Sequence, residues 1–257
     1  MKNLESITDE NKKKAWLHGD WDITAGGAID DLWDRNIHVL TPFAIPRTWY
    51  VDRSFDWGSA KPFSVGWWAE SDGTEALLAD GTRRCWPRGT LFRIGEWYGC
   101  APNDDNTGIR LNSIDIGKGI KEREAILKER LGIKWINPGP ADSSIFDKTD
   151  DESIASKVFA GYGTEIFIPA NKASGTRQRG LELLRTHLEA SLQKPMEHPG
   201  LFIFDTCRDW IRTVPVLARS EKDPEDIDTE AEDHAYDETR YRLIHERSIA
   251  YSVEFRI

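Results

Sequence analysis

The strongest constraint on the fold is a change of periodicity about 110 residues into the chain. Before it, strand-like segments at Thr48–Asp56, Pro62–Glu70 and Thr90–Tyr98 are separated by turn signals, including Asp-Gly at 72–73 and 80–81. Consecutive strands joined by short turns predict an antiparallel meander. After it, apolar residues recur at helical spacing in Ser113–Leu131, and further helices alternate with strands. The sequence therefore predicts a mixed α/β fold, with an antiparallel three-stranded start and flanking helices.

The second half of the chain is expected to contribute strands and helices in alternation. The predicted strands are Ile133–Ile136, Glu165–Pro169 and Leu201–Phe204, and the predicted helices are Asp151–Ala160, Ser174–Gln193, Cys207–Ala218 and Ala231–Glu246. Residues 1–40 are more polar and carry Gly26-Gly27, so we expect an N-terminal arm or linker there and one domain over 41–257.

Net charge is −10, but almost all of it lies in one segment. Glu221–Glu238 holds ten acidic residues and one lysine, so the rest of the chain is close to neutral. Such a run is usually a solvated loop, although it would also be stable next to a bound divalent cation.

No apolar run approaches the length of a membrane span, and no secretory signal is visible. Three widely spaced cysteines favour reduced thiols in a cytoplasmic protein.

Three carboxylates stand at the ends of predicted elements that can converge. Asp56 ends the first strand, Asp142 follows the fourth strand, and Asp237 lies on the last helix one turn after His234. In a ribonuclease H-like sheet the first and fourth strands are neighbours and a late helix crosses them. Close carboxylates repel one another unless cations neutralise them, and such oxygen ligands suit Mg²⁺ or Mn²⁺. Two ions could then cleave a phosphodiester without a covalent nucleophile.

Each of these acids also has a simpler interpretation. Asp56 precedes Gly58 and could form a turn, Asp142 could begin a loop, and Asp237 could be one more solvated acid. Asp147, Asp150 and Asp151 compete with Asp142, and Glu96 is a weaker auxiliary candidate. There is no Gly-x-x-x-x-Gly-Lys-Ser/Thr, Gly-x-Ser-x-Gly, His-Glu-x-x-His or Cys-x-x-Cys motif to support other chemistry.

Several short motifs resemble the C-terminal nuclease domain of the large terminase subunit of tailed bacteriophages. They include Arg53-Ser54-Phe55-Asp56-Trp57-Gly58-Ser59, Lys61-Pro62-Phe63-Ser64-Val65-Gly66-Trp67-Trp68, Gly95-Glu96-Trp97-Tyr98-Gly99, Ala141-Asp142-Ser143-Ser144 and Asp233-His234-Ala235-Tyr236-Asp237 followed by Thr239-Arg240-Tyr241. The opening Gly19-Asp20-Trp21-Asp22 and Gly26-Gly27-Ala28 also resemble the segment that links the packaging ATPase to the nuclease. The resemblance thus extends over nearly the whole chain.

This resemblance implies a ribonuclease H-like, metal-dependent endonuclease that cuts concatemeric double-stranded DNA during genome packaging in the host cytoplasm. Asp56, Asp142 and Asp237 would hold two Mg²⁺ or Mn²⁺ ions, with Asp233 or His234 as accessory ligand or proton-transfer group. The ATPase domain, the small terminase subunit and the portal would be partners. Because the chain has no phosphate loop, no ATP hydrolysis is expected.

Basic residues are expected to bind the DNA backbone. Lys172, Arg177 and Arg179 lie in a stretch without acids, and Arg53 or Lys61 would lie near the scissile strand. Two alternatives stay open. One is another ribonuclease H-like nuclease, such as a junction resolvase or a transposase-type enzyme, and the other is a catalytically inactive module that docks on the packaging motor.

Overall fold

The computed structural model describes residues 27–102, 104–149, 151–220, 223, 225–228 and 231–245. The main strands are β1 (Val39–Leu40), β2 (Tyr50–Asp56), β3 (Ser64–Glu70), β6 (Leu91–Tyr98), β9 (Gly139–Ala141), β12 (Phe167–Pro169) and β13 (Leu201–Phe204). Small two-stranded hairpins are formed by β4 (Ala76–Leu77) with β5 (Arg83–Arg84), β7 (Cys100–Ala101) with β8 (Asp104–Gly108), and β10 (Lys148–Thr149) with β11 (Glu152–Ser153). The helices are α2 (Arg35–His38), α3 (Ser113–Leu131), α4 (Ile154–Tyr162), α5 (Thr176–Leu192), α6 (Arg208–Thr213) and α7 (His234–Ile244), with 3-10 turns η2 (Ser143–Phe146) and η3 (Val214–Val216).

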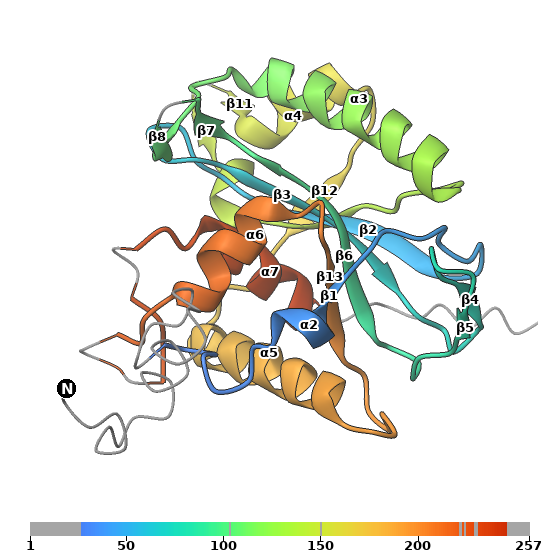
Figure 1. Ribbon diagram of the computed structural model, residues 1–257. Coiled ribbons are helices and arrows are strands. Elements are labelled where there is room, and N and C mark those ends of the chain that lie inside the picture. Colours follow the sequence, from blue (N-terminus) through green and yellow to red (C-terminus); the bar gives the residue numbers. More distant parts are fainter. Residues whose placement is uncertain are drawn as a thin grey trace, which may run out of the picture.

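The main strands form one mixed sheet in the order β1-β13-β6-β3-β2-β9-β12. β2, β3 and β6 are antiparallel neighbours, as the tight turns predict, whereas β9 pairs with β2 in parallel and β13 pairs with β6 in parallel. Helices α3 and α4 cover one face, and α2, α5, α6 and α7 lie on the other (Figure 1). The mixed sheet with flanking helices confirms the predicted fold class.

The strand expected at Ile133–Ile136 is wrong. That segment is irregular, and the strand beside β2 is Gly139-Pro140-Ala141, a sequence that strand propensities disfavour. Gly139 is required there because a Cβ would collide with the carbonyl oxygen of Arg53. The amide of Asp142 donates to the carbonyl of Phe55 at 2.9 Å, so Asp142 follows directly beside the end of β2.

The boundaries of four predicted helices also differ from the sequence expectation. The helix expected at Asp151–Ala160 is α4, which begins at Ile154, and α5 is slightly shorter than the expected Ser174–Gln193. The segment expected to be one helix over Cys207–Ala218 is the short α6 followed by the 3-10 turn η3, which holds Pro215. The last helix begins at His234 rather than Ala231. Within the predicted N-terminal arm, residues 27–40 pack on the sheet, with β1 paired in parallel to β13. The part of that prediction that concerns residues 1–26 lies outside the described residues.

Buried ion pairs fasten α7 across the sheet. Glu238 on α7 is fully buried and accepts hydrogen bonds from Arg93 on β6, Ser54 on β2 and Trp68 on β3. One turn later, Arg242 donates to Asp52 at 2.8 Å and to Glu70 at 3.0 Å. Removing one partner of a buried pair leaves an uncompensated charge, so these contacts strongly favour one position of the helix. They fix α7 over the strand that ends in Asp56.

Candidate active site

The ends of strands β2 and β9 and the first turn of helix α7 meet at a cavity of about 410 Å³ on the α7 side of the sheet. Asp56 from the end of β2, Asp142 after β9 and Asp237 on the first turn of α7 all line it. The loop before α5 and the first turn of that helix form the opposite wall, which carries Lys172 and Arg177. The structure thus brings together the three carboxylates that the sequence singled out, from segments 86 and 95 residues apart along the chain.

Asp56 is the most enclosed of the three, with 5% of its surface exposed. His234 donates from Nδ1 to one carboxylate oxygen at 3.3 Å, and the Tyr241 hydroxyl donates to the other at 3.2 Å. Burial raises the pKa of Asp56 to about 6; His234 opposes the rise, and the charges of Asp237 and Asp142 add to it. The three carboxylates are therefore close enough to repel one another electrostatically, as in a cluster that binds cations.

Asp233 and His234 lie at the start of α7 beside this cluster. Burial raises the pKa of Asp233 to about 7, and the charge of Asp237 adds to the rise. Burial lowers the pKa of His234, but the hydrogen bond and charge of Asp56, with the charges of Asp233 and Asp237, outweigh it and the net shift is upward. His234 is thus placed to carry a proton next to Asp56.

Lysine and arginine side chains pair with the other two carboxylates, Asp142 and Asp237. Lys172 Nζ lies 2.5 Å from Asp142 Oδ1, and this contact, with the amide of Ser144, outweighs burial and lowers the pKa of Asp142. Asp237 accepts from Arg240 at 3.0 Å, and Arg177 lies 3.8 Å away. In the described part of the chain, no group of three or more His, Cys, Asp or Glu side chains is arranged to hold a metal ion.

The donor set nevertheless fits a divalent cation in chemical type. Carboxylate oxygens on three different elements face one cavity, and hard cations such as Mg²⁺ and Mn²⁺ prefer such oxygen ligands. The carboxylates are compensated by Lys172, Arg177 and Arg240 instead, so an ion would have to compete with these side chains.

The predicted DNA-binding residues fall into three groups. Lys172 and Arg177 line the cavity, although Arg177 also donates to Asp226 at 2.6 Å. Lys61, after β2, and Arg179 on α5 are exposed. Arg53 does not reach this surface: it is 1% exposed and paired with Glu124 under α3, so the expectation that it contacts DNA is wrong for this structure.

The other sequence candidates lie apart from the cluster. Glu96 accepts the amides of Asp209 and Trp210 at 2.7 and 3.1 Å and so caps α6. Asp147 is exposed at the end of η2, Asp151 is also exposed, and Asp150 lies outside the described residues. Sequence reasoning gave no role to Tyr241 or Arg240, although both lie within the Thr239-Arg240-Tyr241 motif and one helical turn or less from Asp237. That spacing was the available signal.

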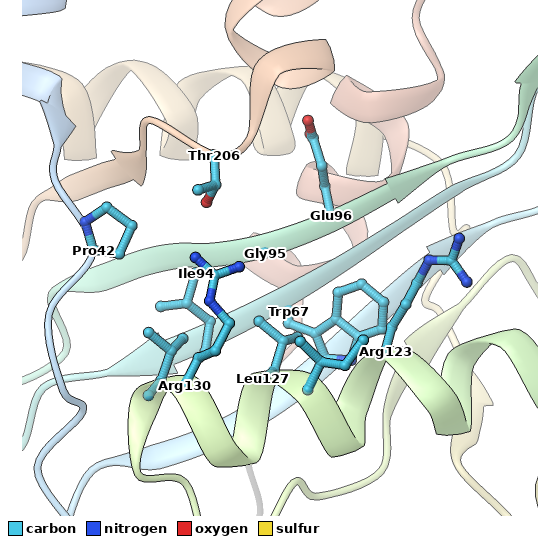
Figure 2. A pocket seen from close by; sticks show the side chains of 11 residues that line it. Pro42, Trp67, Ile94, Gly95, Glu96, Arg123, Leu127, Arg130 and Thr206 are labelled. Carbon is cyan, nitrogen blue, oxygen red and sulfur yellow. The ribbon is translucent and has the colours of Figure 1, made fainter. Parts of the chain in front are cut away.

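A second cavity of about 220 Å³ lies on the other face of the sheet, between β6 and α3. Trp67, Ile94 and Leu127 form an apolar floor there, with Arg123 and Arg130 at its rim (Figure 2). Glu96 points away from α3 (Figure 2). None of the three carboxylates around Asp56 lines this cavity.

Solved structures of known proteins match the overall fold of this chain. The large terminase of a thermophilic bacteriophage matches with a TM-score of 0.55 and 18% identity, over 84% of this chain and 44% of that one. The nuclease domain of the P22 large terminase matches with a TM-score of 0.53 and 14% identity, over 82% of this chain and 89% of the domain. The chain has the fold of the terminase nuclease domain.

The likeness covers most of a terminase nuclease domain but less than half of a whole large terminase. The chain spans 44% of the length of the thermophilic phage's large terminase but most of the isolated P22 nuclease domain. No protein-family model and no curated protein sequence matches it. No helix in the described ranges is both long and apolar enough to cross a membrane. The predicted resemblance to the terminase nuclease domain is confirmed at the level of fold.

Proposed function

We propose that this chain is a metal-dependent endonuclease that cuts double-stranded DNA during phage genome packaging. The observation that carries the proposal is the convergence of Asp56, Asp142 and Asp237 on one cavity within a terminase nuclease fold. Mg²⁺ or Mn²⁺ bound by these carboxylates, with Asp233 as an accessory ligand, would activate water and stabilise the leaving oxygen. The ATPase domain, small terminase subunit and portal are proposed partners on the basis of the fold.

The residues around the carboxylates have separate tasks in this proposal. Tyr241 and His234 orient Asp56 through hydrogen bonds to its two oxygens. Burial and the nearby charges of Asp56, Asp237 and Asp142 raise the pKa of Tyr241, so its hydroxyl stays a donor. His234, whose pKa is also raised, can deliver a proton to the departing 3′-oxygen.

Lys172 and Arg177 would change partners when metal and DNA bind. In this structure their charges compensate Asp142 and Asp237. A divalent ion on the carboxylates removes that task, and the released cations can hold scissile-strand phosphates. The N-terminus of α5 also lines the cavity, and a helix N-terminus favours a phosphate. Lys61 and Arg179 are exposed and would supply further cations for the DNA backbone.

A second candidate function is a catalytically inactive module of the packaging motor. It is favoured by the pairing of Asp142 and Asp237 with cations of the protein and by the lack of a metal-holding group within the described residues. In that case the acidic segment Glu221–Glu238 would bind a partner, except for Asp233 and Glu238, which are buried.

Cleavage of supercoiled plasmid in Mn²⁺, Mg²⁺ or EDTA separates the two candidates. The nuclease should nick and linearise the plasmid only with metal, and Asp56→Ala and Asp237→Ala should each abolish this. Asp147→Ala is the matched control, because this acid belongs to the same region but is exposed and lies outside the cavity. Wild-type protein that leaves the plasmid intact in every condition would favour the inactive module, and cleavage that survives Asp56→Ala would place the site elsewhere.

A further inference from the structure

An exposed tryptophan stands at the end of the sheet opposite to the carboxylates. Trp135 has 71% of its surface exposed and is the most exposed large apolar side chain of the described residues. It lines a cavity of about 310 Å³ whose lining includes Tyr50, the first residue of β2. Asp56 is the last residue of the same strand, and six strand residues span roughly 20 Å. This place is therefore separate from the candidate active site.

The charge around Trp135 is positive. Arg47 and Lys134 line the same cavity and are exposed, and none of the described residues that line it is acidic. Neither cation has a hydrogen bond or ion pair with a described residue. Two exposed cations that have no partner among the described residues thus stand beside an exposed indole and form a basic site.

The segment that carries Trp135 is held in place. Its neighbours Ile133 and Ile136 are buried, and Asn137 donates both its backbone amide and its side-chain amide to the carbonyl of Val51 at 2.8 Å. Arg53 adds a bond to the carbonyl of Ile136 at 3.3 Å. An indole on a fastened segment loses little conformational freedom when it binds, which favours binding.

We propose that Trp135, Lys134 and Arg47 form a binding site for single-stranded DNA, distinct from the cleavage site. A base stacks on the indole, and the neighbouring phosphates lie on the two cations. Only a single strand offers free base faces, because those of a duplex are covered by their neighbours. A protein partner fits less well, since Trp135 is the only large exposed apolar side chain among the described lining residues and protein interfaces need a broader apolar core.

Binding of a fluorescein-labelled oligothymidine of about 12 nucleotides, followed by anisotropy in EDTA, tests this site without cleavage. Trp135→Ala should weaken binding about tenfold or more, and Trp135→Phe should keep most of the affinity. Arg47→Glu with Lys134→Glu should weaken it further. The milder Arg47→Gln with Lys134→Gln should reduce the slope of log affinity against log salt by about 1.4, because two phosphate contacts are lost.

Matched controls separate stacking from general charge. Phe159→Ala removes another exposed aromatic ring, and Arg83→Glu with Arg88→Glu reverses two exposed cations elsewhere. Both should bind the oligonucleotide like the wild type. Unchanged affinity in Trp135→Ala, equal losses in the control pair, or a wild type that binds duplex but not single strands would each overturn the proposal. Asp56→Ala should bind normally, so a failure here is independent of a failure of cleavage.

Discussion

Replacing Arg53 should destabilise the protein, because Arg53 is one half of a buried ion pair with Glu124. Its guanidinium forms a bidentate pair with Glu124, at 2.5 Å from Nε and 2.9 Å from Nη2, with both side chains at most 2% exposed. It also donates to the carbonyls of Ile166 and Ile136 at 3.2 and 3.3 Å. Arg53→Met would leave the Glu124 carboxylate buried with only neutral donors.

The expected loss follows from the cost of an uncompensated buried charge. Breaking a buried pair by removing one partner costs about 3–5 kcal/mol, which is a large part of the roughly 5–15 kcal/mol that stabilises a typical domain. Trp67 and Tyr162 still donate to Glu124 in the variant, at 2.9 and 2.5 Å, so the lower half of that range is expected. Arg53→Met with Glu124→Leu should recover part of the loss, since both charges are then absent.

Urea unfolding followed by tryptophan fluorescence measures these free energies. Lys61→Met is the matched control, because Lys61 is an exposed cation of the same region and should change stability by less than about 0.5 kcal/mol. A loss below about 1 kcal/mol in Arg53→Met, together with weaker DNA binding, would refute the reasoning. It would mean that Arg53 leaves Glu124 and reaches the surface.

Three further predictions concern the candidate active site. Lys172→Gln should tighten Mn²⁺ binding, measured by calorimetry, because the Lys172 ammonium no longer competes for Asp142. The same change should lower the affinity for duplex DNA. Weaker Mn²⁺ binding would show that Lys172 does not compete with the metal. The affinity of the wild type for Mn²⁺ should rise with pH up to about 7, by about tenfold per pH unit for each proton displaced. The reason is that Asp56 and Asp233, whose pKa values are raised to about 6 and 7, must lose their protons to bind the metal. An affinity that stays constant from pH 5 to 8 would contradict this. Asp233→Asn should stabilise the metal-free protein at pH 8 and have little effect near pH 4. The raised pKa of the Asp233 carboxyl costs stability only as pH rises from the ordinary value of 3.8 toward 7, so a gain that is the same at both pH values would contradict this prediction.

The meander and the order of the later elements could be predicted from the sequence because turn residues and apolar periodicity are local signals. The Asp-Gly at 72–73 and the glycine at 132 mark ends that the structure also shows, with positive φ at Gly73 and Gly132. Strand β9 was not predicted from the sequence because Gly139 and Pro140 have poor strand propensity. Its pairing is determined by the close approach to Arg53, a tertiary contact with no local signature.

The candidate site was predictable to the extent that it depends on element ends. Asp56 was singled out at the end of a predicted strand and Asp237 on a predicted helix one turn after His234. Asp142 was singled out after the predicted fourth strand, although the strand that precedes it is Gly139–Ala141 and not Ile133–Ile136. The cations that neutralise them could not be paired in advance, because Lys172 and Asp142 are 30 residues apart and meet only through the parallel pairing of β12 with β9, the strands that precede them. Arg53 was misplaced for the same reason, since its partner Glu124 lies 71 residues away on α3.

The most direct test of the central claim is a crystal of this protein soaked in Mn²⁺ and measured for anomalous scattering. The account predicts manganese peaks bonded to carboxylate oxygens of Asp56, Asp142 and Asp237, with Lys172 moved away from Asp142. Peaks only at other acids, or a cavity in which Lys172 keeps Asp142 and no manganese binds at millimolar concentration, would contradict it.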